Sequence, residues 1–318
     1  MSYPIRYATR ERTAVGLLFA AVSVFFWGIT FVCTKYLLRS FSALEILIGR
    51  FLAAYIGLWL LRPRALHLGR KGDEWLFLLA GLSGVTVYQF MENVALSFTA
   101  ASNVSIIVSV CPIFTAIIAQ LFLKEKHLTA CFVLGFVVAI TGVALVTFNG
   151  AIQLHVSPRG DLLALAAAVS WGFYSLFVSK INRQGLDSIQ ATRRIFFWAL
   201  VFMLPLAVFG VLRGEAAPAG TRITLAAAAN RERWANPLNW VNLLFLGWGA
   251  SAFCFAAWNI ACRTLGTVRA TVGIYLVPVV TIVFAFFALG ERISLMGACG
   301  GLLTITGLFI SEHRKKPA

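Results

Sequence analysis

Long runs of apolar residues recur along the whole chain, separated only by short polar stretches. A helix needs roughly 20 such residues to cross a membrane, because it rises about 1.5 Å per residue through about 30 Å of hydrocarbon. The runs are continuous and do not alternate between apolar and polar positions, which excludes a membrane β-barrel. Ten segments meet the helical requirement, at about 14–37, 43–61, 75–98, 100–122, 128–148, 160–181, 187–212, 238–262, 265–288 and 293–311.

The composition agrees with a chain that lies almost entirely in a lipid bilayer. Of the 318 residues, 60% are hydrophobic and 12% are charged, whereas soluble domains carry about 25% charged residues. Three arginines precede the first apolar run, as in a secretory signal peptide. That run is over 20 residues long, however, and no small-residue cleavage site follows it. We therefore expect it to stay in the protein as the first helix.

The net charge of +15 raises the question of a nucleic-acid partner. The basic residues are scattered over short loops and form no single cluster. With the amino terminus inside, fifteen Lys and Arg residues fall on inside segments and seven on outside segments. The positive-inside rule therefore predicts cytoplasmic termini, at 1–13 and 312–318, although the outside loop 213–236 is itself basic. We expect a protein of a bacterial inner membrane, with lipid and a small molecule as partners and no nucleic acid.

The sequence carries no motif for catalysis, metal binding or ATP hydrolysis. The six cysteines lie in apolar runs without CxxC spacing, and the four histidines fall in separate loops. No HxxxD, DxD or HExxH string occurs, which argues against the main rival class, an integral membrane transferase. A P-loop string and a channel filter or ring of charges do not occur either. We therefore expect a protein that is not an enzyme and has no metal or cofactor.

The chain repeats itself. The string WGITFVCTK at 27–35 returns as WGFYSLFVSK at 171–180, and a shift of 144 residues also aligns Arg50 with Arg194. Later in each half a shift of 166 residues aligns a second set, namely Asn93 with Asn259, Pro112 with Pro278, Glu125 with Glu291 and Gly135 with Gly301. The chain is therefore predicted to consist of two similar halves, at 14–148 and 160–311, joined by a linker at 149–159.

Each half carries five of the predicted spans. Because five is odd, the second half must enter the membrane from the opposite side to the first. The predicted fold is an all-α membrane protein in which ten transmembrane helices form two inverted five-helix repeats around a central cavity. Inverted repeats are typical of secondary transporters, since two equivalent halves can present one central site to either side in turn.

At these residues the chain resembles a known family. The paired halves, the Trp-Gly pair in the first span of each, and the run from Asn93 through Pro112 to Glu125 are similar to EamA-type members of the drug/metabolite transporter superfamily. The resemblance covers roughly residues 14–311 and looks most like the YddG-type amino-acid exporters. It implies a basket of ten helices with a central cavity lined mainly by the first, third, fourth, sixth, eighth and ninth, and export of amino acids or similar metabolites.

Several residues are candidates for that cavity. Trp27 lies about 13 residues into its helix, or roughly 20 Å along it, which is away from the headgroup level where tryptophan is common. Trp27 and Trp171 can form stacking walls for an organic substrate, or they can pack against neighbouring glycines. Glu92 can bind an amine or carry a proton, or it can reach the membrane surface. The set expected at the cavity is Trp27, Trp171, Tyr88, Glu92, Asn93, Asn259, Trp258 and Tyr275.

Four cationic residues are candidates for gating. Arg50 and Arg194 lie roughly 10 to 12 Å inside their spans, where an unpaired charge costs at least about 2 kcal/mol. Glu45 and Asp187 are possible partners, and both structural pairing and gating are open. The remaining two come late in their helices, where they either extend to the membrane surface or bind or gate the substrate; they are Lys35 and Lys180.

Pro112 and Pro278 stand in the middle of their spans and predict kinks, because each removes a backbone hydrogen bond. They are candidates for hinges, with a static bend as the alternative. Glu125 and Glu291 follow them by thirteen residues. We expect these two acids to cap the next helix or to pair with cations of the loops.

An aromatic cavity with few charges favours a zwitterion that has an apolar side chain. The predicted substrates are therefore amino acids, aromatic or otherwise neutral, exported by alternating access. Drugs, purines and other amphipathic metabolites fit the same pattern, whereas a nucleotide sugar would need more cations near the midplane. Proton coupling through Glu92 and the oligomeric state both stay open, because lipid-facing and partner-facing apolar surfaces look alike in a sequence.

Overall fold

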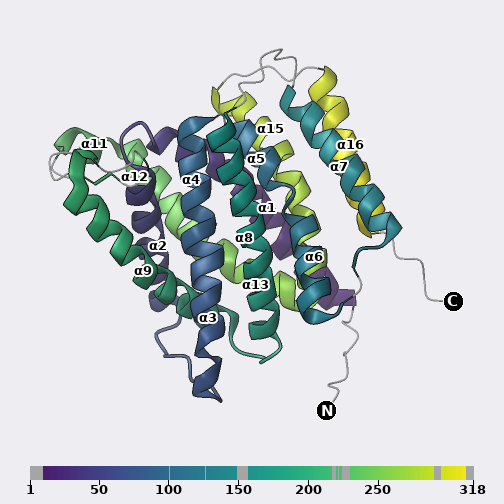
Figure 1. Ribbon diagram of the computed structural model, residues 1–318, viewed down its shortest axis with the longest axis horizontal. Helices are drawn as coiled ribbons and strands as arrows, with labels where there is room; N and C mark the ends of the chain where they lie inside the picture. Colours follow the sequence, from purple (N-terminus) through teal and green to yellow (C-terminus); the bar gives the residue numbers. More distant parts are fainter. Residues whose placement is uncertain are drawn as a thin grey trace.

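The computed structural model describes residues 10–99, 101–125, 127–148, 157–216, 220, 222–223, 230–289 and 295–312. All regular structure in these ranges is helical, and the long helices lie side by side as a bundle (Figure 1). The predictions for the end segments 1–9 and 313–318, for the linker at 149–156 and for Glu291 fall outside the described residues.

The helices follow the apolar runs of the sequence. Four of the runs form single long helices, namely α1 (Arg10–Leu37), α2 (Ala43–Leu61), α8 (Pro158–Asn182) and α9 (Ser188–Arg213). Two more are single but shorter, α7 (Ala130–Phe148) and α16 (Leu295–Glu312). The short elements η1 (Lys71–Asp73), η3 (Gly214–Ala216) and α11 (Arg231–Ala235) lie in connections.

The other four runs are interrupted helices. The third is α3 (Glu74–Ala80), the π-helical segment η2 (Gly81–Val87) and α4 (Tyr88–Phe98). The fourth is α5 (Ala101–Val108) followed by α6 (Cys111–Leu123). The eighth is α12 (Pro237–Leu244), the π-helical segment η4 (Phe245–Phe253) and α13 (Cys254–Leu265), and the ninth is α14 (Thr267–Val272), η5 (Gly273–Leu276) and α15 (Val277–Leu289).

Six helical stretches in the described part of the chain are long and apolar enough to cross a membrane: Glu11–Leu37, Ala43–Leu61, Val104–Leu123, Pro158–Asn182, Ser188–Arg213 and Pro237–Leu265. Three further apolar helices are shorter, at Ala130–Leu145, Thr267–Thr281 and Cys299–Ser311. The described part of the chain is therefore that of a helical membrane protein.

Both predicted prolines interrupt their helices. Pro112 stands at the start of α6, directly after the break at Ser109 and Val110. Pro278 stands at the start of α15, directly after η5. A proline has no N–H to give to the preceding turn, so the α-helical ladder cannot run through it. Each proline therefore lies next to a change of helix type or a break in the helix, and the role of hinge stays a prediction.

The acids Glu45 and Asp187 cap helices and do not pair with Arg50 and Arg194. The Ser42 hydroxyl accepts a hydrogen bond from the Glu45 N–H, and the Glu45 carboxylate accepts one from the Ser42 N–H, so the two close a capping box at the start of α2. The Asp187 carboxylate accepts a bond of 3.0 Å from the Gln190 N–H at the start of α9. Each acid therefore fixes where its helix begins.

Small residues let helices approach closely at two places. The helices α7 and α16 lie together at one side of the bundle (Figure 1), and a Cβ added to Gly142 of α7 would lie 2.4 Å from the Thr304 nitrogen of α16. In the centre, a Cβ added to Gly84 of η2 would lie 2.1 Å from the ring of Tyr174 on α8. The ring of Tyr174 is buried and packs 4.9 Å from that of Trp171, so it has no free space into which to move.

Gly84→Ala is expected to destabilise the protein through this contact. Overpacking of a dense interior costs about 1 to 3 kcal/mol, so the melting midpoint of the detergent-purified protein should fall by several degrees. Gly49→Ala is the matched control, because a Cβ there would meet only Leu243, at an ordinary 3.8 Å. Size-exclusion chromatography after heating measures both midpoints. Equal midpoints for the two variants would contradict the packing argument.

Glu125 ties the loop after α6 to the end of α8. Its carboxylate accepts bonds of 2.8 Å from His127 and 2.7 Å from Arg183, as expected for an acid that pairs with loop cations. The hydrogen bond from His127 is the main reason why the pKa of Glu125 lies below its usual range, and Arg183 adds to the effect. A lowered pKa means that the pairing stabilises the protein above about pH 4.3, the value in an unfolded chain, and that this contribution is lost as the pH falls through the folded-state value.

Glu125→Gln is therefore expected to lower the melting midpoint at pH 7, and to lower it by less near pH 3.5. The difference between wild type and variant, measured at both pH values, should shrink on acidification. Glu232→Gln, on the exposed surface of α11, is the control. An undiminished difference at low pH would show that charge pairing at Glu125 is not the cause.

Candidate functional site

A small cavity lies in the middle of the bundle. Its walls come from α1, α2, α4, α5, α8, η5 and α15, with the residues Trp27, Thr30, Phe31, Arg50, Tyr88, Gln89, Glu92, Val108, Trp171, Ile274 and Val277. Its volume is about 30 Å³. This is room for one or two water molecules, whereas sites that hold small molecules measure about 300 to 1,000 Å³. The cavity is therefore too small to hold a small-molecule substrate in this conformation.

Arg50 is the charged group that shapes the cavity. Its residue is 1% exposed, and it extends from the middle of α2 into the bundle. Its Nε donates a bond of 3.0 Å to the Ser251 hydroxyl of η4, and its Nη1 donates one of 2.8 Å to the Gln89 carbonyl oxygen of α4. Both partners are neutral, so these bonds fix the guanidinium without cancelling its charge.

Glu92 supplies the opposite charge at the same cavity. The residue is 4% exposed, so the alternative of an acid exposed at the membrane surface is wrong. The two polar side chains that interact with the Glu92 carboxyl are Tyr88 and Arg50. The cavity therefore has one buried cation and one buried acid in its wall, which satisfies the rule that buried charges need nearby partners.

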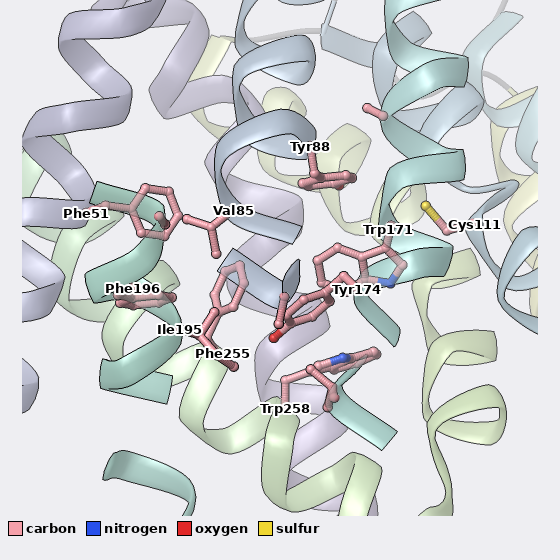
Figure 2. Close-up of a cluster of buried hydrophobic side chains, with 14 of the residues drawn as sticks. Phe51, Val85, Tyr88, Cys111, Trp171, Tyr174, Ile195, Phe196, Phe255 and Trp258 are labelled. Atoms are coloured by element: carbon pink, nitrogen blue, oxygen red, sulfur yellow. The ribbon is translucent and has the colours of Figure 1, made fainter. Parts of the chain in front are cut away.

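Aromatic rings pack along one side of the cavity. The rings of Trp27 and Trp171 lie 5.4 Å apart and nearly perpendicular, at 87°. Tyr88 lies 4.9 Å from Trp171 on one side, and Trp258 lies 4.8 Å from Trp27 on the other. Figure 2 shows Trp171 between Tyr88 above it and Tyr174 and Trp258 below it. Edge-on ring contacts of this kind are favourable, and they separate the cavity from the layer of rings beneath.

Four of the predicted cavity residues are placed elsewhere by the structure. The Asn93 amide donates to the Ala43 carbonyl at 3.2 Å and so connects α4 to α2. The Asn259 amide donates to the Thr192 hydroxyl at 2.7 Å and connects α13 to α9. Tyr275 is buried against Phe136, with their rings 6.3 Å apart. Trp258 does not line the cavity and packs beneath it.

The other predicted gating residues lie outside the cavity. The Arg194 Nε donates to both oxygens of Glu74, at 2.9 and 3.0 Å, so its partner comes from α3 and not from its own helix. The Lys35 ammonium donates to the carbonyls of Leu96 and Thr99, at 2.5 and 2.9 Å, at the end of α4. The Lys180 ammonium lies 5.5 Å from the ring centre of Trp75. Of the four cations, only Arg50 contributes to the cavity wall.

Three polar residues at this site were not among the predicted cavity residues: Gln89, Thr30 and Ser251. Gln89 stands in the stretch VYQFMEN, three positions before Glu92, and therefore shares a face of α4 with it. The spacing of three residues from Glu92 was therefore enough to predict Gln89 at the same site. Ser251 is one of many small residues in its run, and nothing in the local pattern distinguishes it.

Comparison with known proteins gives the class of this chain. The model of the EamA-like transporter family matches residues 14–148 and 158–312. The chain belongs to this family, whose members are transporters. The resemblance seen in the sequence is therefore confirmed.

Individual relatives cover nearly the whole chain. An uncharacterized transporter of Archaeoglobus fulgidus is 28% identical, over 94% of this chain and 97% of its own. A probable terminal-alkyne amino-acid exporter of Streptantibioticus cattleyicolor is 26% identical, over 92% of each chain. A probable amino-acid metabolite efflux pump of Escherichia coli is 26% identical, over 92% and 93%. A solved crystal structure superposes with a TM-score of 0.70 at 17% identity, over 95% of both chains, which shows the fold alone.

Asn93 and Asn259 are expected to hold helices together without touching substrate. Replacing either one by alanine removes a bond between helices and should cost about 1 to 3 kcal/mol, lowering the melting midpoint. Substrate affinity of the folded protein should stay within about threefold. Asn242→Ala is the control, because the Asn242 amide bonds only to Leu238 of its own helix. A large loss of affinity in a variant that melts normally would place that asparagine at the site.

Proposed function

We propose that the protein exports amino acids, aromatic or otherwise neutral, or similar small metabolites by alternating access. The observation that carries this proposal is that buried Arg50 and buried Glu92 both line one aromatic-walled cavity. An amino acid has a carboxylate, which a guanidinium binds strongly, and an ammonium, which a carboxylate binds. The ring faces of Trp27 and Trp171 suit an apolar or aromatic side chain.

The names of two relatives support this class of substrate. One is a probable terminal-alkyne amino-acid exporter and another a probable amino-acid metabolite efflux pump. An amphipathic drug or a purine would use the rings but would leave at least one of the two buried charges without a partner. The zwitterion satisfies both charges and is therefore preferred.

The proposed architecture is ten transmembrane helices in two inverted repeats, at 14–148 and 160–311, with both termini in the cytoplasm and the protein in the inner membrane. Two features support it. The family model matches the two halves separately. Helical interruptions also recur at corresponding places, with η2 matching η4 and Pro112 matching Pro278. Each proposed repeat has five helices, which is an odd number, so the two repeats must enter the membrane from opposite sides.

The matching positions of the two halves carry different residues, and this difference supports an alternating mechanism. The shifts of 144 and 166 residues relate Thr30, Gln89 and Glu92 of the cavity wall to a second set in the other half: Tyr174, Phe255 and Trp258. These three are fully buried and pack beneath the cavity, with Tyr174 and Phe255 6.0 Å apart. In the proposed cycle this aromatic layer closes one side while the cavity opens to the other. The helices then bend at Pro112 and Pro278 so that the opposite side opens.

Binding of matched ligands tests the roles of the two charges. Phenylalanine, phenethylamine and phenylpropionate differ only in their charged groups. If Arg50 binds the carboxylate, Arg50→Gln should weaken phenylalanine binding about 10- to 100-fold, as expected for loss of a charged hydrogen bond, and phenethylamine binding much less. Glu92→Gln should spare phenylpropionate instead. Equal losses for all three ligands in a folded variant would contradict these assignments.

Counterflow in proteoliposomes tests the transport activity itself. Vesicles preloaded with unlabelled amino acids should accumulate labelled phenylalanine, tryptophan, threonine, methionine or alanine, and Trp171→Ala should abolish this accumulation. Leu60→Ala, on the exposed side of α2, is the control that should remain active. No accumulation of any amino acid by well-folded protein would contradict the proposed substrate class and favour drugs or purines.

A further inference from the structure

A groove separate from the central cavity lies at the end of the bundle where α2 ends and α9 begins. Two adjoining cavities, of about 300 and 560 Å³, share the lining residues Ala65, Leu66 and Gln190, so they form one continuous space. We call it the α2–α9 groove. Figure 1 shows the end of α2 and the starts of α3 and α9 at the same end of the bundle. The loop 62–70 forms part of its wall.

One part of the groove is aromatic and open to the outside of the bundle. It is lined by Tyr55 and Trp59 from α2 and by Phe197 and Trp198 from α9. Trp59 is 36% exposed and Phe197 45% exposed. These rings lie on membrane-spanning helices, so the exposed faces meet lipid. Tryptophan and tyrosine concentrate at the level of lipid headgroups, so this part of the groove suits a ligand that has an apolar chain.

The groove also carries arginines, Arg193 beside the aromatic rings and Arg64 in the adjoining cavity. The Arg193 guanidinium lies 3.8 Å from the ring centre of Trp59 and donates a hydrogen bond of 2.5 Å to the Arg62 carbonyl and another to the Arg64 carbonyl. Arg64 itself lines the second cavity. Among the described residues, neither Arg64 nor Arg193 forms an ion pair.

The two acids in the groove wall already have partners. Glu74 is bound by three contacts from Arg194 and by the Trp198 indole N–H. Asp187 accepts the Gln190 N–H as the cap of α9. Asp187 also interacts electrostatically with Arg193. The groove wall nevertheless holds three arginines, Arg64, Arg193 and Arg194, against these two carboxylates. Its net charge is therefore positive, and it stands beside rings that face lipid. Arg is the side chain best suited to bind phosphate groups, because its planar fork presents several donors.

We propose that the α2–α9 groove binds an anionic phospholipid. The phosphate lies against Arg64 and Arg193, and an acyl chain lies along Tyr55 and Phe197. A free phosphate would use the arginines but not the exposed rings. The site is independent of the transported substrate. A bound lipid would tie the loop 62–70 to α9 and so stabilise the protein, since a ligand that binds only the folded state raises its stability.

The melting midpoint in a neutral detergent tests this proposal. Phosphatidylglycerol added to saturation should raise the midpoint by about 5 °C or more, and phosphatidylcholine should raise it much less. Arg193→Gln and Arg64→Gln should each remove the extra effect of phosphatidylglycerol. Arg70→Gln is the control, since Arg70 is an exposed cation of the same connection outside the groove. Arg64 is also exposed, so its variant should fold even if the Arg193 variant does not.

Three results would overturn the proposal. The first is an equal shift with both lipids, and the second is a full shift with phosphatidylglycerol in Arg64→Gln. The third is a shift of the same size with inorganic phosphate alone, which would make the site one for a free anion. Native mass spectrometry, with phosphatidylglycerol retained by wild type and Arg70→Gln and lost from Arg64→Gln, would support it.

Discussion

The burial of Arg50 is the constraint on which the centre of the molecule depends. A guanidinium at this depth in a bilayer has to be surrounded by protein groups, and here they come from two other helices, α4 and η4. Ser251 of η4 and Gln89 of α4 accept its N–H groups, and Glu92 supplies a compensating charge. The orientation of α2, α4 and η4 is therefore set by one side chain.

The π-helical segments make this arrangement possible. A π-helical turn carries an extra residue and changes which side chains face the interior. In η4 this turn contains Ser251, and η2 directly precedes Tyr88 and Gln89. Close approach of Gly84 to Tyr174 brings η2 against α8. The cavity, the π-helical segments and the close approach at Gly84 therefore depend on one another in the packing of the helices.

Arginine and glutamate pairs connect the first half of the chain to the second around this centre. Arg233 donates to Glu45 at 2.9 Å near the start of α2, and Arg194 binds Glu74 at the start of α3. In both pairs the acid comes from the first half and the cation from the second. Because such pairs need precise geometry to offset the loss of hydration, they hold the two halves in one relative position and must rearrange if the halves move.

The sequence by itself determined the class of protein and most of its helices. Apolar length and the prolines act within one segment, so the sequence pattern reports them directly. The aromatic pair Trp27 and Trp171 and the acid Glu92 could be predicted for the same reason, as unusual residues deep in apolar runs. Only the tertiary structure decided which of them meet. The partners of Arg50, the link of Arg194 to Glu74 and the removal of Asn93 and Asn259 from the cavity depend on how each helix is rotated against segments far away in the chain, and local patterns do not encode that rotation.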